Sequence, residues 1–292
     1  MTTPAVSIVV RCRDEAAHLG GVLEGVLSQA GAPPYEVLAI DSGSRDGTLA
    51  LLGRYPVRVE RLRPEAFTWG RALNLGARLA HGEIVVYLSA HCRPLSGSWL
   101  ATLVAPLADP AVVATFGRQV PIPGVNPIEA IAQARLFPAA PPAGVCFSNA
   151  NAAVRRAAVL VHPFDEDVPA AEDHLWACQV DGPERIVYVP AAAVAHSHPM
   201  TLREWCFRFY INGLAGEYAR RRCGIDMPWD SHEPSSSTGS RTRSFLRLAA
   251  TLARGREVRA LARLPAYAFA RTVWYTRGVR EGARRYGSSG RG

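Results

Sequence analysis

The stretch E-I-V-V-Y-L-S-A-H-C-R-P, residues 83–94, decides how the rest of the chain is organised. Residues 84–88 are an unbroken apolar run, typical of a strand that is buried on both faces in the middle of a parallel sheet. The run ends at the small polar Ser89, so His91 stands just beyond the carboxyl end of the strand. Because ligands of open α/β sheets bind outside these strand ends, His91 is a candidate binding residue.

Strands and helices are predicted to alternate on both sides of this stretch. The strands are expected at residues 6–12, 35–40, 57–62, 84–88, 112–120, 146–154 and 185–194. The helices are expected at residues 19–27, 69–80, 99–107, 128–136 and 170–180, with a further helix opening at Thr48. This alternation predicts an α/β fold, with a Rossmann-like, mostly parallel sheet and helices on both faces.

Two nucleotide-binding classes are excluded by missing motifs. The first strand runs into R-C-R-D-E (11–15), where a dinucleotide-binding fold needs G-x-G-x-x-G. The chain also lacks G-x-x-x-x-G-K-[ST], which excludes a P-loop enzyme.

The net charge of +8 is concentrated in the last third of the chain. Residues 1–200 carry 15 Arg against 18 acidic residues, whereas residues 201–292 carry 18 Arg against 7. We expect a first domain at 1–222, a flexible linker at 223–243 and a basic helical extension at 244–292. Arginines mixed with aromatic residues in the extension predict amphipathic helices and peripheral contact with an anionic membrane surface. Packing of these helices on the first domain is the alternative, and without a recognition motif no nucleic-acid partner is expected.

The remaining bulk features point to a cytoplasmic protein. The six cysteines form no C-x-x-C pair, which is typical of reduced thiols. The N-terminus lacks the basic region of a signal peptide, and no apolar stretch reaches 18 residues. Any membrane contact is therefore expected to be peripheral, on the inner face. The oligomeric state is left open.

Polar motifs follow the predicted strands at one edge of the sheet. They are Asp41 after the second strand, His91 after the fourth, Glu172-Asp173 at the head of a helix, and His196 and His198 after the last strand. This combination supplies a carboxylate for a nucleotide, candidate metal ligands and a carboxylate pair for base chemistry.

In this order the motifs resemble those of the inverting glycosyltransferases of family 2, which have the GT-A fold, and in particular the bacterial rhamnosyltransferase-like members. The resemblance covers about residues 5–215 and rests on eight motifs in the family's order, none of them specific alone. They are V-S-I-V-V (6–10), D-E-A (14–16), D-S-G-S-R-D-G-T (41–48), F-T-W-G-R-A-L-N (67–74), G-R-Q (117–119), F-S-N (147–149), E-D (172–173) and H-S-H (196–198).

The resemblance implies that a sugar is moved from a nucleoside-diphosphate sugar to an acceptor hydroxyl with inversion. The implied donor is a dTDP- or UDP-sugar, with dTDP-rhamnose as the first candidate, and the acceptor is a glycan, a lipid-linked glycan or a small molecule. The implied nucleotide-sugar site comprises Arg11, Glu15, Asp41, Arg71, Asn74, Ser89 and His91. Turn capping is the alternative role of Asp41.

The resemblance also implies that Asp173 is the base that takes the proton from the acceptor hydroxyl, with Glu172 orienting it or sharing the site. The alternative is that both carboxylates only favour a helix N-terminus. Asn149 and Trp176 are the candidate acceptor residues, and a place in the core is the alternative for Trp176.

The chain departs from the family at the D-x-D motif, where it has Ser89-Ala90-His91. An imidazole binds Mn²⁺, Co²⁺ or Zn²⁺ but suits Mg²⁺ poorly, although Mn²⁺ and Mg²⁺ are the metals that the resemblance suggests. Either His91 holds a divalent metal together with His196 or His198, or arginines and protonated histidine neutralise the diphosphate without metal. The departure leaves a second interpretation, a nucleotide-sugar- or carbohydrate-binding protein of the same fold without catalysis. A nucleotidyltransferase would need a G-x-G-x-R loop after the first strand, which is absent.

Overall fold

The computed structural model describes residues 3–140, 147–180, 185–196, 200–227, 248–255 and 257–287, which form two compact units. The first unit comprises residues 1–122, 134–167 and 172–197 and contains an eight-stranded sheet. The second comprises residues 123–133, 168–171 and 198–292 and is helical.

The elements of the first unit match the predicted alternation. The strands are β1 (Val6–Cys12), β2 (Tyr35–Asp41), β3 (Arg58–Arg61), β4 (Ile84–Ser89), β5 (Arg93–Pro94), β6 (Ala114–Val120), β7 (Asn151–Arg155) and β8 (Ile186–Ala195). The helices are α1 (Ala16–Leu27), α2 (Thr48–Leu52), α3 (Trp69–Leu79), α4 (Trp99–Val104), α6 (Arg156–Val161) and α7 (Glu172–Gln179), with 3-10 turns η1 (Pro64–Ala66) and η2 (Ala105–Ala108).

The strands lie in the order β3-β2-β1-β4-β7-β6-β8-β5. β3, β2, β1 and β4 are parallel to one another, as are β6 and β8, whereas β7 is antiparallel to both of its neighbours. The expected α/β class with a mostly parallel sheet is confirmed. Three details differ from the sequence prediction: β5 and α6 were not foreseen, and β7 begins at Asn151 rather than at residue 146.

Helices cover both faces of the sheet. Successive residues of each buried strand point to opposite sides, so apolar side chains pack against helices on both faces. On one face, Ile8 and Val86 pack in a cluster with residues of α1, α2 and α4. On the other, Val9 and Tyr87 pack with residues of α3, α6 and α7. This double burial explains why residues 84–88 form an unbroken apolar run.

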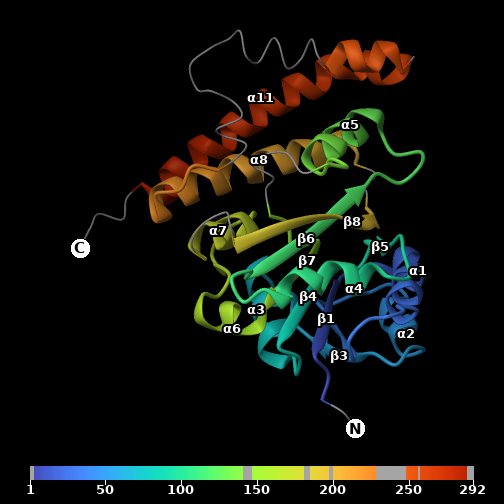
Figure 1. Cartoon of the computed structure of the whole chain (residues 1–292). Helices are drawn as coiled ribbons and strands as arrows, with labels where there is room; N and C mark the ends of the chain where they lie inside the picture. The colour runs from blue at the N-terminus through green and yellow to red at the C-terminus, as the bar shows by residue number, and fades with distance from the viewer. Residues whose placement is uncertain are drawn as a thin grey trace. The chain divides into compact units, whose positions relative to one another are not determined.

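The second unit is built on two long helices, α8 (Leu202–Tyr218) and α11 (Val258–Tyr286), which run side by side (Figure 1). α8 begins with a capping box between Thr201 and Glu204 and ends in a π-helical turn, η4 (Ala219–Cys223). Residues 248–254 are also helical, and α5 (Pro127–Leu136) begins in this unit. Gly213 and Gly278 allow close approach, since a Cβ on either would overlap the backbone of the other helix.

The predicted boundary at residue 222 separates α8 from the C-terminal helices, whereas α8 packs on α11 in the structure. The three-part division of the chain stays a prediction, and residues 228–243 of the predicted linker lie outside the described residues. Within the part of the chain that the structure describes, no helix is long and apolar enough to cross a membrane.

Candidate functional site

Strand register brings several of the predicted site residues to one edge of the sheet. Cys12 at the end of β1 lies opposite Asp41 of β2, and Arg11 lies opposite Ser89 of β4. Because β7 is antiparallel to β4, its amino end meets this edge, and Ser89 N donates to Ala150 O at 3.2 Å. The loop before β7, which carries Asn149, therefore joins the carboxyl ends of β1 and β4.

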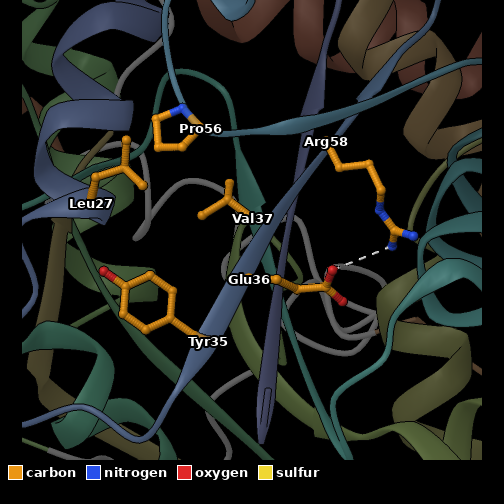
Figure 2. Close-up of a pocket in the computed structure, with 6 residues that line it drawn as sticks. All are labelled: Leu27, Tyr35, Glu36, Val37, Pro56 and Arg58. Atoms are coloured by element: carbon orange, nitrogen blue, oxygen red, sulfur yellow. Dashed lines mark ion pairs between the residues drawn. The ribbon is translucent and has the colours of Figure 1, made fainter. Parts of the chain in front are cut away.

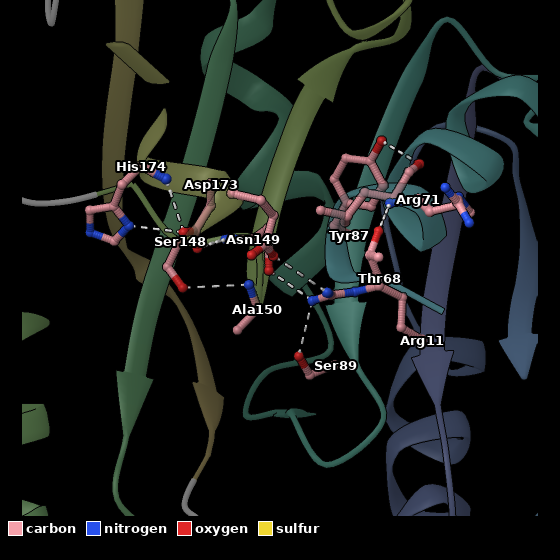
Figure 3. Close-up of polar contacts among 12 residues, drawn as sticks. Arg11, Thr68, Arg71, Tyr87, Ser89, Ser148, Asn149, Ala150, Asp173 and His174 are labelled. Carbon is pink, nitrogen blue, oxygen red and sulfur yellow. Dashed lines mark hydrogen bonds and ion pairs between the residues drawn. The ribbon is translucent and has the colours of Figure 1, made fainter. Parts of the chain in front are cut away.

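A hydrogen-bonded group forms around the two carboxylates at the start of α7 (Figure 3). Asn149 Nδ2 donates to Glu172 Oε1 at 2.7 Å, and the backbone N of Asn149 donates to Asp173 Oδ2 at 3.2 Å. Arg11 Nη2 donates to Asn149 Oδ1 at 2.7 Å, and Arg11 Nη1 lies 4.0 Å from Glu172 Oε1. Asn149 thus fixes both carboxylates relative to the buried guanidinium.

The two carboxylates have different environments. Burial, followed by the charge of Asp173, raises the pKa of Glu172 to about 7, against the opposing effect of Arg11. Burial also acts to raise the pKa of Asp173, but the neighbouring His174 and hydrogen bonds to the carboxylate hold it below its usual value. His174 Nδ1 lies 2.8 Å from Asp173 Oδ1. Near pH 7 Asp173 is therefore ionised, while Glu172 is close to its titration midpoint.

A second group lies at the ends of β4 and β8 and contains two stacked histidines. The rings of His91 and His196 stack with centroids 5.0 Å apart. His91 Nδ1 lies 2.7 Å from Glu15 Oε1, and His196 Nδ1 lies 2.6 Å from Gln119 Oε1. These contacts orient both imidazoles.

Cys92 completes this second group. Candidate ligand atoms of His91, Cys92 and His196 all lie within 4.8 Å of one another. A turn in which Cys92 N donates to Ser89 O, and the pairing of β5 with β8, bring Cys92 close to His196. His91 and His196, two of the predicted metal ligands, therefore lie together, and their binding of a metal stays a prediction. Cys92 was not foreseen, and His198 lies outside the described residues.

The carboxylate of Asp41 is almost fully buried and caps its own loop. It accepts hydrogen bonds from Gly43 N at 3.0 Å and from the backbone and hydroxyl of Ser44. This is the turn-capping role that sequence left as the alternative. A contact between Asp41 and a nucleotide stays a prediction.

Arg71 and Asn74 of α3 meet at Glu166 rather than at the carboxylate pair. Arg71 Nε lies 2.8 Å from Glu166 Oε2, and Asn74 Nδ2 donates to Glu166 Oε1 at 3.0 Å. Asn74 also bonds both backbone polar groups of Phe164. These residues hold the acidic loop at 163–169 on α3, and their contact with a donor stays a prediction.

Trp176 is fully buried. Its ring stacks on Phe164 with centroids 5.3 Å apart and lies 5.4 Å from the ring of Phe147, and its Nε1 donates to His162 O at 2.7 Å. The structure therefore favours the core role over the predicted acceptor contact.

A pocket of about 450 Å³ lies elsewhere, at the amino end of β2 (Figure 2). Its charged residues, Glu36 and Arg58, pair with each other at 3.5 Å. Since the candidate site lies at the carboxyl ends of the parallel strands, this pocket is at the opposite end of β2 and adds no group to the site.

Comparison with known proteins places these groups in a family context. The model of glycosyl transferase family 2 matches residues 7–159. O-antigen chain rhamnosyltransferase RfbN of Salmonella typhimurium is 25% identical over 227 residues, which cover 72% of this chain and 71% of the relative. Pre-mycofactocin glycosyltransferase of Mycobacterium tuberculosis is 31% identical over 163 residues, which cover 51% of this chain but only 34% of the relative.

Solved structures share the fold. Mannosyltransferase PcManGT from Pyrobaculum calidifontis, in complex with GDP-Man and Mn²⁺, matches with a TM-score of 0.63 and 20% identity over 97% of this chain and 88% of its own. Glucosyl-3-phosphoglycerate synthase from Mycobacterium tuberculosis, in complex with Mn²⁺, UDP-glucose and phosphoglyceric acid, matches with a TM-score of 0.57 and 20% identity over 77% of this chain and 81% of its own. The expected GT-A architecture is confirmed.

Proposed function

This chain belongs to glycosyl transferase family 2, and from that premise we propose that it transfers a sugar from a dTDP- or UDP-sugar to an acceptor hydroxyl with inversion. The observation that carries the proposal is the pair Glu172 and Asp173, held by Asn149 at the carboxyl edge of the sheet. The rhamnosyltransferase activity printed for the relative RfbN makes dTDP-rhamnose the first donor to try. A glycan, lipid-linked or small-molecule hydroxyl compound would be the acceptor.

In this proposal Asp173 is the general base, and Glu172 modulates it. The side chain of Asp173 is 14% exposed and that of Glu172 is 7% exposed, so Asp173 is the better placed of the two to meet an acceptor hydroxyl. Asp173 is also ionised at neutral pH, as proton abstraction requires. Inversion follows if the activated hydroxyl attacks the anomeric carbon from the side opposite the leaving diphosphate.

The second group fits a divalent metal. Metal-binding histidines commonly present one ring nitrogen to the metal while the other contacts a carboxylate or amide, which is the arrangement of Glu15 and Gln119 on the two Nδ1 atoms. His91, Cys92 and His196 would hold the ion, which would neutralise the donor diphosphate. Two imidazoles and a thiol favour Zn²⁺ or Co²⁺ over Mg²⁺, with Mn²⁺ next because the structural neighbours contain it.

The proposal predicts that nucleotide sugars stabilise the protein against heat. A donor that binds the folded state raises the unfolding temperature by mass action. We expect dTDP-rhamnose or UDP-glucose to raise Tm in a thermal-shift screen, with free rhamnose as the control. If no nucleotide or nucleotide sugar shifts Tm at millimolar concentration, the proposed donor site is wrong.

We also propose that α11 brings the enzyme to an anionic lipid surface. One face of this helix exposes apolar side chains at helical spacing, with Val258, Phe269 and Val273 exposed by 72%, 70% and 42%. Seven arginines and one glutamate lie on the same helix. Exposed apolar residues flanked by arginines fit the interface of an anionic membrane better than they fit water.

Co-sedimentation with vesicles tests this contact. Full-length protein should pellet with phosphatidylglycerol vesicles at low salt and less with phosphatidylcholine vesicles, because each arginine near an anionic surface adds about 1 kcal/mol. Replacing both Phe269 and Val273 by Asp should abolish pelleting. The control is Val161→Asp, at a valine of α6 that is as exposed as Phe269. A double variant that pellets like the wild type would rule out this face.

A further inference from the structure

Trp69, the first residue of α3, is a large aromatic side chain left 47% exposed. Single exposed apolar residues are common on protein surfaces and by themselves carry no function. Trp69 differs because it lies on a tightly packed turn and because its ring contacts Arg11, which is also a neighbour of Glu172.

The ring packs against an aromatic neighbour, and the turn that carries it is held by a helix cap and a close backbone contact. Phe67 packs against it in an edge-to-face geometry with centroids 5.0 Å apart. Thr68 caps α3 by accepting a hydrogen bond from Arg71 N at 3.1 Å. A Cβ on Gly70 would overlap the backbone of Asp165, so this turn of α3 sits tightly against the acidic loop. An indole on so constrained a turn is preorganised for a ligand.

Arg11 links this ring to the carboxylates. The guanidinium carbon of Arg11 lies 5.7 Å from the centroid of the Trp69 ring, within cation–π range. The same guanidinium donates to Asn149 and lies 4.0 Å from Glu172. Trp69 and the carboxylate pair are therefore neighbours of one buried side chain, which is 8% exposed.

A flat exposed ring that shares a neighbour, Arg11, with a carboxylate selects a particular ligand chemistry. A pyranose has a face of weakly positive C–H groups, which complements the negative face of an indole, and hydroxyls that donate to carboxylates. A purely apolar ligand would make no use of the polar groups beside the ring. We propose that Trp69 is a stacking platform for a pyranose ring in the site that contains Asp173.

The proposal rests on the proposed transferase function and names a sugar contact within it. The stacked pyranose can belong to the donor or to the acceptor. Stacking energies for aromatic rings predict a loss of about tenfold in affinity when the ring is removed. Trp69→Ala removes the platform, Trp69→Phe keeps a smaller one, and Leu95→Ala, at a residue exposed by 48%, is the control.

The experiment measures the Kd of dTDP-rhamnose and of dTDP by calorimetry, and the KM of octyl rhamnoside as an acceptor probe. A donor platform predicts that Trp69→Ala weakens dTDP-rhamnose about tenfold and leaves dTDP within about twofold. An acceptor platform predicts the same loss in the KM of octyl rhamnoside alone. Trp69→Phe should lose about threefold, and Leu95→Ala should resemble the wild type.

Two results would overturn the platform. In the first, Trp69→Ala changes neither the Kd of dTDP-rhamnose nor the KM of octyl rhamnoside. In the second, Trp69→Ala weakens the binding of dTDP as much as that of dTDP-rhamnose. In both, a wild type that cleaves the donor keeps the transferase function intact. A wild type that binds no nucleotide sugar overturns the transferase function itself, and the platform with it.

Discussion

Asp173→Asn should lower kcat by about 10² or more while leaving the affinity for the donor nearly unchanged. The substitution keeps the size of the side chain and its contact with Asn149 N, but it removes the negative charge that accepts the acceptor's proton. The measurement is steady-state transfer or donor hydrolysis, with donor Kd determined in parallel. Turnover like that of the wild type would exclude Asp173 as the base.

Glu172→Gln is the matched variant, because it changes the adjacent carboxylate in the same way. With the pKa of Glu172 near 7, kcat of the wild type should rise between about pH 6 and 8, since an ionised Glu172 makes Asp173 more basic. Glu172→Gln should keep kcat near its low-pH value and abolish the rise of kcat between these pH values. If the rise of kcat persists in this variant, the titrating group is not Glu172.

His91→Ala should weaken donor binding by about tenfold to a hundredfold, because His91 is proposed to meet the diphosphate through a metal. Chelation of the wild type with EDTA should cause a similar loss, and Zn²⁺, Co²⁺ or Mn²⁺ should restore binding better than Mg²⁺. The donor Kd and the metal content of the purified protein are the readouts.

His81→Ala is the control for this prediction, because His81 also pairs with a glutamate, Glu36 at 3.1 Å, but at the other end of the sheet. It should bind donor like the wild type. If EDTA has no effect while His91→Ala weakens binding, the metal-free version holds, in which arginine and histidine neutralise the diphosphate. Normal donor binding by His91→Ala would exclude contact of His91 with the diphosphate, both through a metal and without one.

Much of the fold could be predicted because local sequence patterns indicate its strands and helices. The apolar run of β4 and the order of the motifs indicated a sheet buried on both faces, with Asp173 and His91 at one edge. The features that the sequence did not predict depend on pairing between segments that lie far apart in the chain. Cys92 joins the histidines only because β5 pairs with β8, and a two-residue strand leaves no periodic signal. Its place directly after His91 was the one available hint.

Other residues serve roles that spacing alone cannot separate. Asn74 and Arg71 hold Glu166 although they lie in a motif that also fits ligand contact. Trp176 fills the core although it follows the E-D motif by one helical turn. The packing of α8 on α11 depends on Gly213 and Gly278, whose close approach is visible only once the helices are paired. Trp69 lies within the motif at 67–74, but its contact with Arg11 joins residues far apart in the sequence, so the motif alone predicts no role for it.

Donor cleavage followed by proton NMR tests the proposed transferase function most directly. Purified protein is mixed with dTDP-rhamnose or UDP-glucose, with octyl rhamnoside or water as acceptor, and the anomeric signals are recorded from the first minutes. We expect loss of the sugar diphosphate and a first product whose anomeric configuration is inverted. Retention of configuration, or tight binding without any cleavage, would contradict it, and the latter would indicate a nucleotide-sugar-binding protein of the same fold.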